Sequence, residues 1–174
     1  MDHYIPKRRI PVTIWSGDRQ GVQGFVFLDL DAASAQHQTI LQKLNESAPF
    51  LPIAVGEDGV SHLFNKARVT RVTAGRQVLQ SDVFSRGFLP WREEEADVVL
   101  MDGTQLDGRV WMPLQRETQR VSDFLNQIGN GFFVLLTATA VHLVNASAVS
   151  EVVLRESIGA PLNGLGAVDA APVG

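Results

Sequence analysis

The sequence contains no cysteine and no apolar run longer than the strand-sized Phe132–Leu136. The lack of cysteine excludes disulfides, Cys-based zinc sites and thiol catalysis. A membrane-spanning helix needs about 20 apolar residues in succession, and the sequence has no such run. Residues 1–6 hold no apolar core of the length that a signal peptide needs. We therefore expect a cytoplasmic protein that does not enter a membrane.

An excess of basic residues is also missing. The chain has 15 Lys and Arg against 19 Asp and Glu, which gives a formal net charge of −4 at pH 7. A protein that wraps nucleic acid neutralises phosphates with cations and is usually strongly basic, so a nucleic-acid partner is not favoured. Two local clusters of basic residues are nevertheless present. We interpret residues 7–9 as a solvated arm, and Lys66, Arg68 and Arg71 as a candidate basic patch.

What the sequence does contain is a set of landmarks that occurs twice in the same order. The clearest pair is His62-Leu63-Phe64-Asn65 and His142-Leu143-Val144-Asn145, each followed by two spaced valines. Earlier matches are Gly24 with Gly108, Leu44-Asn45 with Leu125-Asn126, and Phe50 with Phe132. Repeats of this kind indicate an internal duplication, in which each copy is one small structural unit.

Each unit is predicted to run strand, turn, strand, helix, strand, turn, strand and a short last strand. The helices are predicted over 30–45 and 121–126, where apolar residues recur with helical spacing. Asp31 is the expected N-cap of the first helix and Gly129 the expected C-terminal cap of the second. The predicted fold class is mainly β with two short helices (α+β).

The chain divides accordingly into four parts. Residues 1–72 are predicted as the first repeat with its N-terminal arm, 98–156 as the second repeat, and 157–174 as a flexible tail rich in Gly, Ala and Pro. The linker between them, 73–97, carries Phe88 and Trp91 and is too apolar for a free tether. A unit of roughly 60 residues is marginally stable alone, so we expect Phe88 and Trp91 to pack between the repeats.

The strand pattern resembles that of Sm-like and SH3-like barrels. An alternating apolar strand, the turn Asp102-Gly103 and the segment Gly108-Arg109-Val110 resemble the first Sm motif, and Val144-Asn145-Ala146 resembles the second. The chain as a whole is similar to an uncharacterised bacterial family of duplicated small β-barrel domains. This resemblance implies tandem Sm-like barrels.

The resemblance does not extend to a nucleotide pocket. Sm proteins bind uridine with an Arg-Gly pair in the second motif, and that place is held here by Asn65-Lys66 and Asn145-Ala146. Asparagine at such a turn between strands is expected to bond its own backbone. His62 and His142 also occupy matching positions, but two imidazoles are too few ligands for a metal site. They are interpreted as strand residues.

No residue is a candidate for catalysis, because neither a nucleophile elbow nor a phosphate-binding glycine loop is present. We therefore expect a non-enzymatic protein without cofactor or metal. The leading hypothesis is an interaction or assembly module that pairs with a protein partner, or with another copy of itself, through strand edges. The alternative is a regulatory domain that binds a small ligand between the repeats.

Overall fold

A computed structural model of the chain describes residues 7–17, 20–30, 37–84, 91–113 and 120–155. Two successive sets of elements follow the same order along the chain. The first half, residues 7–75, comprises β1 (Lys7–Ser16), β2 (Val22–Asp29), α1 (Ile40–Asn45), β3 (Phe50–Val55), β4 (Val60–Asn65), the 3-10 turn η1 (Lys66–Arg68) and β5 (Val69–Gly75).

The second half, residues 91–155, repeats this order. It comprises β6 (Trp91–Leu100), β7 (Gln105–Pro113), α3 (Val121–Ile128), β8 (Phe132–Leu136), β9 (Ala140–Asn145), the 3-10 turn η2 (Ala146–Ala148) and β10 (Val149–Leu154). A short helix, α2 (Gln80–Val83), lies between the halves. The described part of the chain thus has three short helices where two were expected, and its mainly β character is as predicted.

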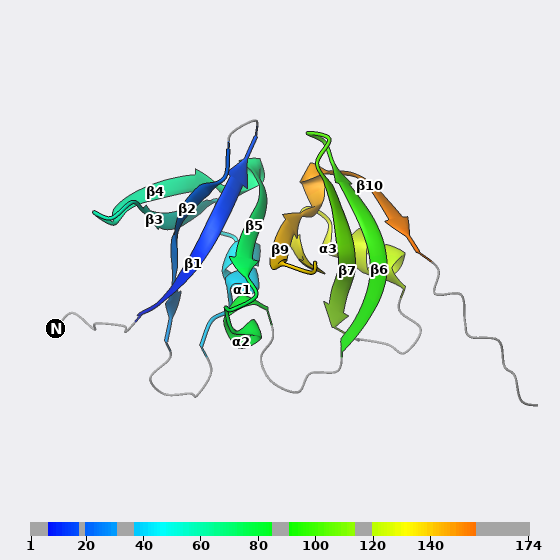
Figure 1. Ribbon diagram of the computed structural model, residues 1–174, viewed down its shortest axis with the longest axis horizontal. Helices are drawn as coiled ribbons and strands as arrows, with labels where there is room; N and C mark the ends of the chain where they lie inside the picture. The colour runs from blue at the N-terminus through cyan, green and yellow to red at the C-terminus, as the bar shows by residue number, and fades with distance from the viewer. Residues whose placement is uncertain (1–6, 18–19, 31–36, 85–90, 114–119, 156–174) are drawn as a thin grey trace, which may run out of the picture.

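All strands join one antiparallel sheet of ten strands in the order β10-β6-β7-β8-β9-β5-β1-β2-β3-β4. The fifth strand of each half pairs with its first strand, so both halves share the order fifth, first, second, third, fourth. The halves are joined where β5 pairs with β9. The sheet does not close. Its two end strands, β4 and β10, lie at opposite ends of the molecule (Figure 1).

The predicted linker over 73–97 is shorter than expected. Its first residues belong to β5, which runs to Gly75, and its last seven form the start of β6, which begins at Trp91. The three consecutive glutamates of β6 have a low intrinsic propensity for β-strands. They are held in the sheet because β6 pairs with β7 along nearly its whole length, from Trp91 opposite Pro113 to Val99 opposite Gln105.

The first helix is also shorter than predicted, since α1 covers only Ile40–Asn45. Leu30 instead forms an antiparallel bridge with His37. The N-cap is Thr39, whose hydroxyl accepts from the Gln42 amide at 3.2 Å while the Gln42 side chain accepts from the Thr39 amide at 3.0 Å. This reciprocal pair is a capping box. Asp31, the predicted N-cap, lies outside the described residues.

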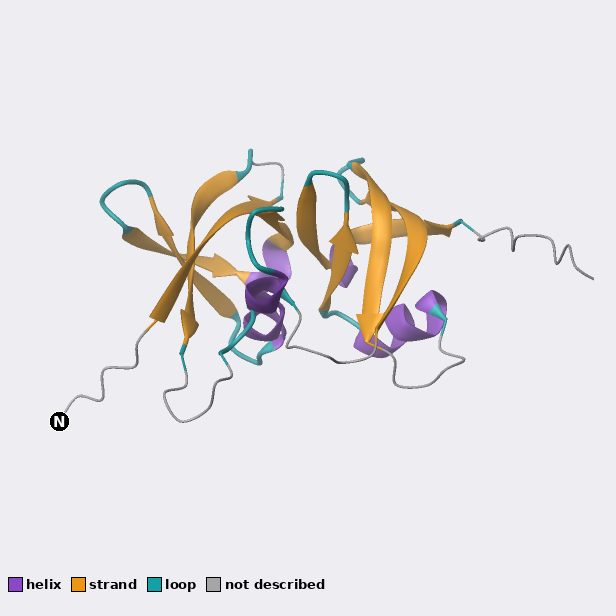
Figure 2. Ribbon diagram, turned by 60° about the horizontal axis from the view of Figure 1, so that its bottom comes forward, coloured by secondary structure: helices purple, strands orange, loops and turns teal. Residues whose placement is uncertain are grey.

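The second helix begins where the sequence predicts. Val121 and Phe124 are its buried residues, and Gly129 ends it with φ of 58°, a left-handed conformation that favours glycine. In Figure 2 the helices form one group between the two halves and another against the second half.

Gly24 and Gly108 do not mark bulges, as glycine in a strand can suggest. They allow the second strand of each half to approach the third closely. A Cβ atom on Gly24 would lie 2.7 Å from the carbonyl oxygen of Ala54, and one on Gly108 would lie 2.4 Å from that of Leu136. Both glycines are therefore required by the same close contact at the same place in each half.

The two halves share a hydrophobic core. One buried cluster is confined to the second half, around Val98, Val110 and Phe133. The other contains most of the buried residues of the first half together with Trp111, Phe132, Val134, Leu136, Val141 and Leu143 from the second. Because side chains from β7, β8 and β9 complete the core of the first half, the halves form one packed body.

Candidate functional site

The junction between the halves is built by β5 and β9. Their register places Arg71 opposite Val144, Thr73 opposite His142 and Gly75 opposite Ala140. Leu143 of β9 is fully buried in the core of the first half. The junction therefore combines a strand ladder with an apolar contact, and it joins a fifth strand to a fourth strand.

A chain of hydrogen bonds crosses this junction. The Trp15 indole N–H donates to the Thr73 hydroxyl oxygen at 3.1 Å, and that hydroxyl lies 3.1 Å from Nδ1 of His142. On the other side of the ring, Nε2 lies 3.4 Å from the Thr137 hydroxyl oxygen, and that hydroxyl donates to the carbonyl of Ala140 at 3.1 Å. Every donor has an acceptor when the Thr73 hydroxyl donates to Nδ1 and a neutral His142 donates from Nε2.

His142 is neutral for an electrostatic reason as well. Burial in the junction, and next to it the positive charge of Arg71, lower the pKa of His142 to about 4. The histidine thus acts as a structural hydrogen-bonding group at neutral pH. His62, its counterpart in β4, is exposed and stacks on Phe64 with ring centroids 6.4 Å apart.

Two asparagines connect the halves through backbone groups. Asn45 at the end of α1 accepts from the amide of Phe132 at 2.8 Å and donates to the carbonyl of the same residue at 3.1 Å. Asn145 donates from Nδ2 to the carbonyls of Lys66 at 3.2 Å and Val69 at 2.9 Å. Asn126, the counterpart of Asn45, is exposed within α3 and does not end that helix, contrary to the prediction.

Asn65 and Asn145 have a second role that the sequence predicts. Each is the N-cap of a 3-10 turn, and its side-chain oxygen accepts from the amide two residues later, that of Ala67 in η1 and that of Ser147 in η2. The local geometry of the fourth strand's end is therefore the same in both halves. The additional bonds of Asn145 across the junction have no counterpart at Asn65 within the described residues.

The predicted basic patch does not form one exposed surface. Lys66 is buried, and its Nζ donates to the carbonyls of Lys43 at 3.4 Å and Glu46 at 2.5 Å, at the end of α1. Arg71 is also buried, with its guanidinium 4.2 Å from the ring centroid of Trp15. Burial lowers the pKa of both side chains. Of the three cations, Arg68 alone is exposed.

The aromatic contact near the linker differs in part from the prediction. Phe88 lies outside the described residues. Trp91 is 45% exposed at the start of β6, with its ring centroid 6.3 Å from that of Trp111. The buried pair is formed by Phe84 and Trp111, whose ring centroids are 4.9 Å apart in an edge-on arrangement. Phe84 directly follows α2. The adjacent apolar residues Val83 and Phe84 are the feature of the sequence from which a buried contact next to α2 could have been predicted.

Sequence reasoning also missed a buried carboxylate. Asp82 of α2 lies 2.9 Å from the Arg8 guanidinium and 2.9 Å from Nε2 of His37, and its side chain is almost completely buried. These contacts join β1, the segment before α1, and α2. The cluster holds α2 against the first half, so its role is structural.

A cavity of about 630 Å3 lies at the junction. Its walls come from the end of α1, η1, the start of β8 and the end of β9, and they include Asn45, Lys66 and Asn145. Each of these three side chains already has a backbone partner. Asn45 and Asn145 use these bonds to join the halves, whereas Lys66 holds the end of α1 within the first half.

The two ends of the sheet are a second feature of functional interest. All six residues of β4 line a groove of about 1170 Å3, whose other wall includes Ser16, Val22 and Thr70. Leu63 of β4 is 67% exposed, and Phe50 of the neighbouring β3 is 49% exposed. At the other end, Val153 and Leu154 of β10 are the exposed large apolar residues.

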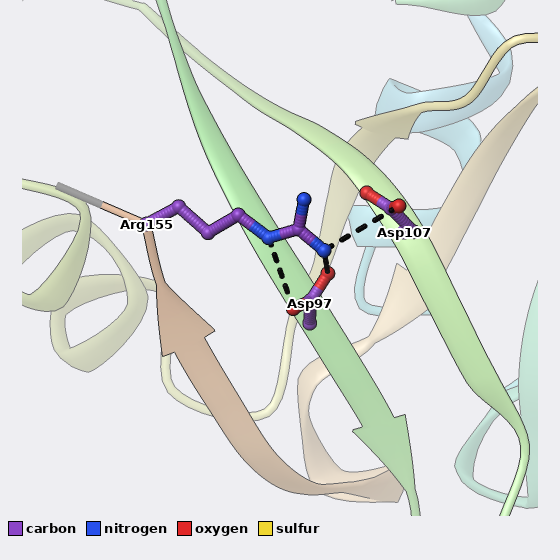
Figure 3. Close-up of polar contacts among 3 residues, drawn as sticks. All are labelled: Asp97, Asp107 and Arg155. Atoms are coloured by element: carbon purple, nitrogen blue, oxygen red, sulfur yellow. Dashed lines mark hydrogen bonds and ion pairs between the residues drawn. The ribbon is translucent and has the colours of Figure 1, made fainter. Parts of the chain in front are cut away.

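Arg155 holds β10 in place. Its guanidinium donates to both carboxylate oxygens of Asp97 in β6, at 3.1 and 2.7 Å, and lies 3.5 Å from Asp107 in β7 (Figure 3). Its amide donates to the carbonyl of Glu95 at 3.1 Å. These contacts bind the end of β10 to its own half, and among the described strands β10 pairs with β6 alone.

Comparison of the chain with protein-family models, with curated proteins and with solved structures finds no match. Within the described ranges, no helix is long and apolar enough to cross a membrane.

Proposed function

We propose that this chain is a non-enzymatic assembly module, built from two Sm-like barrel repeats, that adds a strand of a protein partner to the open ends of its sheet. The observation that carries the proposal is that, in the part of the chain that the structure describes, β4 and β10 each have one unpaired edge and exposed large apolar side chains. An unpaired edge presents a row of backbone donors and acceptors that a neighbouring chain can extend.

The composition of β4 supports this function. Natural proteins protect a free edge with charged side chains, proline or a covering segment. The strand Val-Ser-His-Leu-Phe-Asn contains neither Lys, Arg, Asp, Glu nor Pro, and five of its six residues, all but Phe64, are exposed. Leu63 in particular is exposed where its counterpart Leu143 is fully buried. An edge of this kind is suited to be covered by a partner.

The proposal that each half is an Sm-like repeat rests on matching details. The two halves have the same strand order, the same asparagine-capped 3-10 turn before the fifth strand, and a bulge early in that strand. The Thr70 hydroxyl donates to the carbonyl of Trp15 at the first bulge, and the Ser150 hydroxyl donates to that of Val99 at the second. A duplication explains why hydroxyl side chains at matching positions make the same bond in both halves.

A non-enzymatic role agrees with how the buried ionisable groups are used. Lys66 caps the end of α1, Arg71 stacks on Trp15, Asp82 binds Arg8 and His37, and His142 bridges two threonines. Each of these groups connects elements of the fold. A second candidate function, a regulatory domain that binds a small ligand between the repeats, is favoured by the 630 Å3 cavity at the junction.

Strand addition can be tested with a displayed library of extended seven-residue peptides, using the chain immobilised sparsely so that copies do not meet. We expect enrichment of peptides with alternating apolar residues, and loss of their binding to Leu63→Lys or Val153→Lys. Leu79→Lys, which changes an exposed leucine away from both edges, should bind as the unaltered chain does. Absence of enrichment, or binding that survives both edge substitutions, would contradict the proposal. Binding that is instead lost on Ser47→Trp at the cavity wall would support the ligand-binding alternative.

A further inference from the structure

The junction inside the chain joins unlike edges. It pairs the fifth strand of the first half, β5, with the fourth strand of the second half, β9. What remains at the ends of the sheet is the complementary pair, the fifth strand of the second half and the fourth strand of the first, β10 and β4. A contact between unlike edges can repeat from one molecule to the next, whereas a contact between like edges stops at a dimer.

The free edges have the backbone geometry of the paired ones. The bulge in β5 falls between its pairings with Trp15 and Ser16, and the bulge in β10 falls between Val149 and Glu151, just inside the start of each strand. The fourth strands β4 and β9 pair with the third strands over matching positions, from Phe50 opposite Asn65 and from Phe132 opposite Asn145. Neither free edge needs to be rebuilt to form a ladder like that of β5 and β9.

The side chains differ between the halves in exposure rather than in kind. Phe132 and Leu143 of the second half are 5% and 0% exposed because they pack into the core of the first half, whereas their counterparts Phe50 and Leu63 are 49% and 67% exposed. Leu125 and Ile128 of α3 are only partly buried against the core of the second half. The second half therefore offers apolar side chains where the first half receives Leu143.

We propose that the partner strand comes from a second copy of this chain, with β10 of one copy pairing antiparallel with β4 of the next in the register that joins β5 to β9. This inference rests on the proposed function of strand addition at the sheet edges. The register pairs Glu151 with Phe64, Val152 with Leu63, Val153 with His62 and Leu154 with Ser61. Glu151 is the one charged residue among these eight, so no like charges face each other across the new ladder.

The same correspondence assigns two polar contacts. Asn145 bonds the carbonyls of Lys66 and Val69 within the chain, so Asn65 of the next copy bonds those of Ala146 and Val149. Asn45 bonds the backbone of Phe132, so Asn126 bonds the backbone of Phe50 in the next copy. Both Asn65 and Asn126 are exposed in the single chain.

The first test is the mass in solution, measured by light scattering or sedimentation from low micromolar to high micromolar concentrations. The unaltered chain and Leu79→Lys should form a species whose mass is a multiple of the 19.0 kDa chain. Leu63→Lys blocks β4 alone and Val153→Lys blocks β10 alone, so each should be a monomer by itself. An equimolar mixture of these two variants should give a one-to-one dimer, because each still has the edge that the other lacks.

A monomer of the unaltered chain at all concentrations would overturn the inference. So would a dimer of either edge variant by itself, which would show that like edges pair. If the displayed peptides bind the edges while the purified chain stays monomeric, strand addition stands and the copy as partner fails. Circular dichroism of each variant checks that it is folded, and both substitutions replace exposed side chains.

The register can be tested by disulfide cross-linking between introduced cysteines, because the chain has no native cysteine that could compete. Residues directly opposite in an antiparallel ladder have Cα atoms about 4.5–5.5 Å apart, within the range that a disulfide spans. His62→Cys and Val153→Cys should therefore form a disulfide between copies under mild oxidation. The combination of His62→Cys with Glu151→Cys, displaced by two residues, should form little. Equal cross-linking in both combinations would show that β10 does not pair with β4 in this register.

Discussion

The strands β4 and β9 have closely similar sequences and opposite environments. Both carry His-Leu followed by an apolar residue and Asn, both pair with a third strand, and both end in an asparagine-capped turn. Strand β9 is buried along nearly its whole length because β5 covers its edge, and β4 is exposed. Whether a fourth strand is buried thus depends on whether another strand pairs with its edge. Its residues are compatible with both a buried and an exposed environment.

The largest difference between these strands is expected at their leucines. Leu143→Ala removes a fully buried side chain from the shared core and should lower the free energy of unfolding by about 2–5 kcal/mol. Leu63→Ala, measured at concentrations where the chain is monomeric, should change it by about 0.5 kcal/mol or less because the side chain is exposed. Urea unfolding with a common m-value checks both. Equal losses would mean that β4 is covered within the single chain.

Burial of His142 should make the stability of the fold depend on pH. The pKa of His142 is about 4 in the folded chain and 6.5 without burial, so between these values the unfolded chain holds a proton that the folded chain lacks. Stability should therefore fall as the pH is lowered through this window, by about 3 kcal/mol in total.

His142→Gln should flatten the dependence of unfolding free energy on pH between 6.5 and 4, because glutamine stays neutral. His62→Gln, the matched change in the exposed strand, is the control for the loss of a histidine outside the junction. Urea unfolding at a series of pH values measures both. A slope that survives His142→Gln would assign the acid sensitivity to another group.

A smaller difference is expected between the capping asparagines. Asn145→Ala removes the cap of η2 and the bonds to the carbonyls of Lys66 and Val69, and should cost about 1–3 kcal/mol because buried carbonyls lose their partner. Asn65→Ala removes a cap alone and should cost about 1 kcal/mol. Thermal unfolding compares them. Equal shifts would show that the bonds of Asn145 across the junction add little.

The smallest effect is expected where β10 is held by an exposed ion pair. The hydrogen bonds to Asp97, and after them the charge of Asp107, raise the pKa of Arg155, but the ion pair is open to solvent and is screened by salt. Arg155→Gln should speed hydrogen exchange of the β10 amides at low salt while those of β5 stay protected. Arg109→Gln, which breaks a different surface pair with Glu93, should leave β10 unchanged. Faster exchange in both variants would indicate general loosening.

Much of the fold could be predicted from local pattern. The order of elements follows from apolar alternation and turns, and α3 follows from its helical spacing and Gly129. The start of α1 could not be predicted this way, because apolar residues after Leu30 have helical spacing while Leu30 itself forms a strand bridge. Likewise the three consecutive glutamates of β6 have a low strand propensity, and their pairing with β7 overrides that propensity.

The candidate site was harder to predict because it depends on contacts between distant segments. Matching positions identified His142 and Asn145 as strand and turn residues, and both are. Local pattern does not say which of two similar strands will be paired across a junction. Lys66 and Arg71 illustrate the same limit. Their spacing in the sequence suggests an exposed basic surface, but it does not reveal that Lys66 bonds the end of α1 and that Arg71 stacks on Trp15.

The pairing of β5 with β9 within one chain has a consequence for dilution. Two segments joined by a short connection meet at an effective concentration of about millimolar, whatever the amount of protein. The internal ladder, which also buries Leu143 and Trp111, therefore persists in the most dilute sample, whereas any contact between chains obeys mass action. Larger assemblies of this protein should therefore dissociate into whole chains, each with both halves still paired. The two halves of one chain should separate from each other only when the chain unfolds.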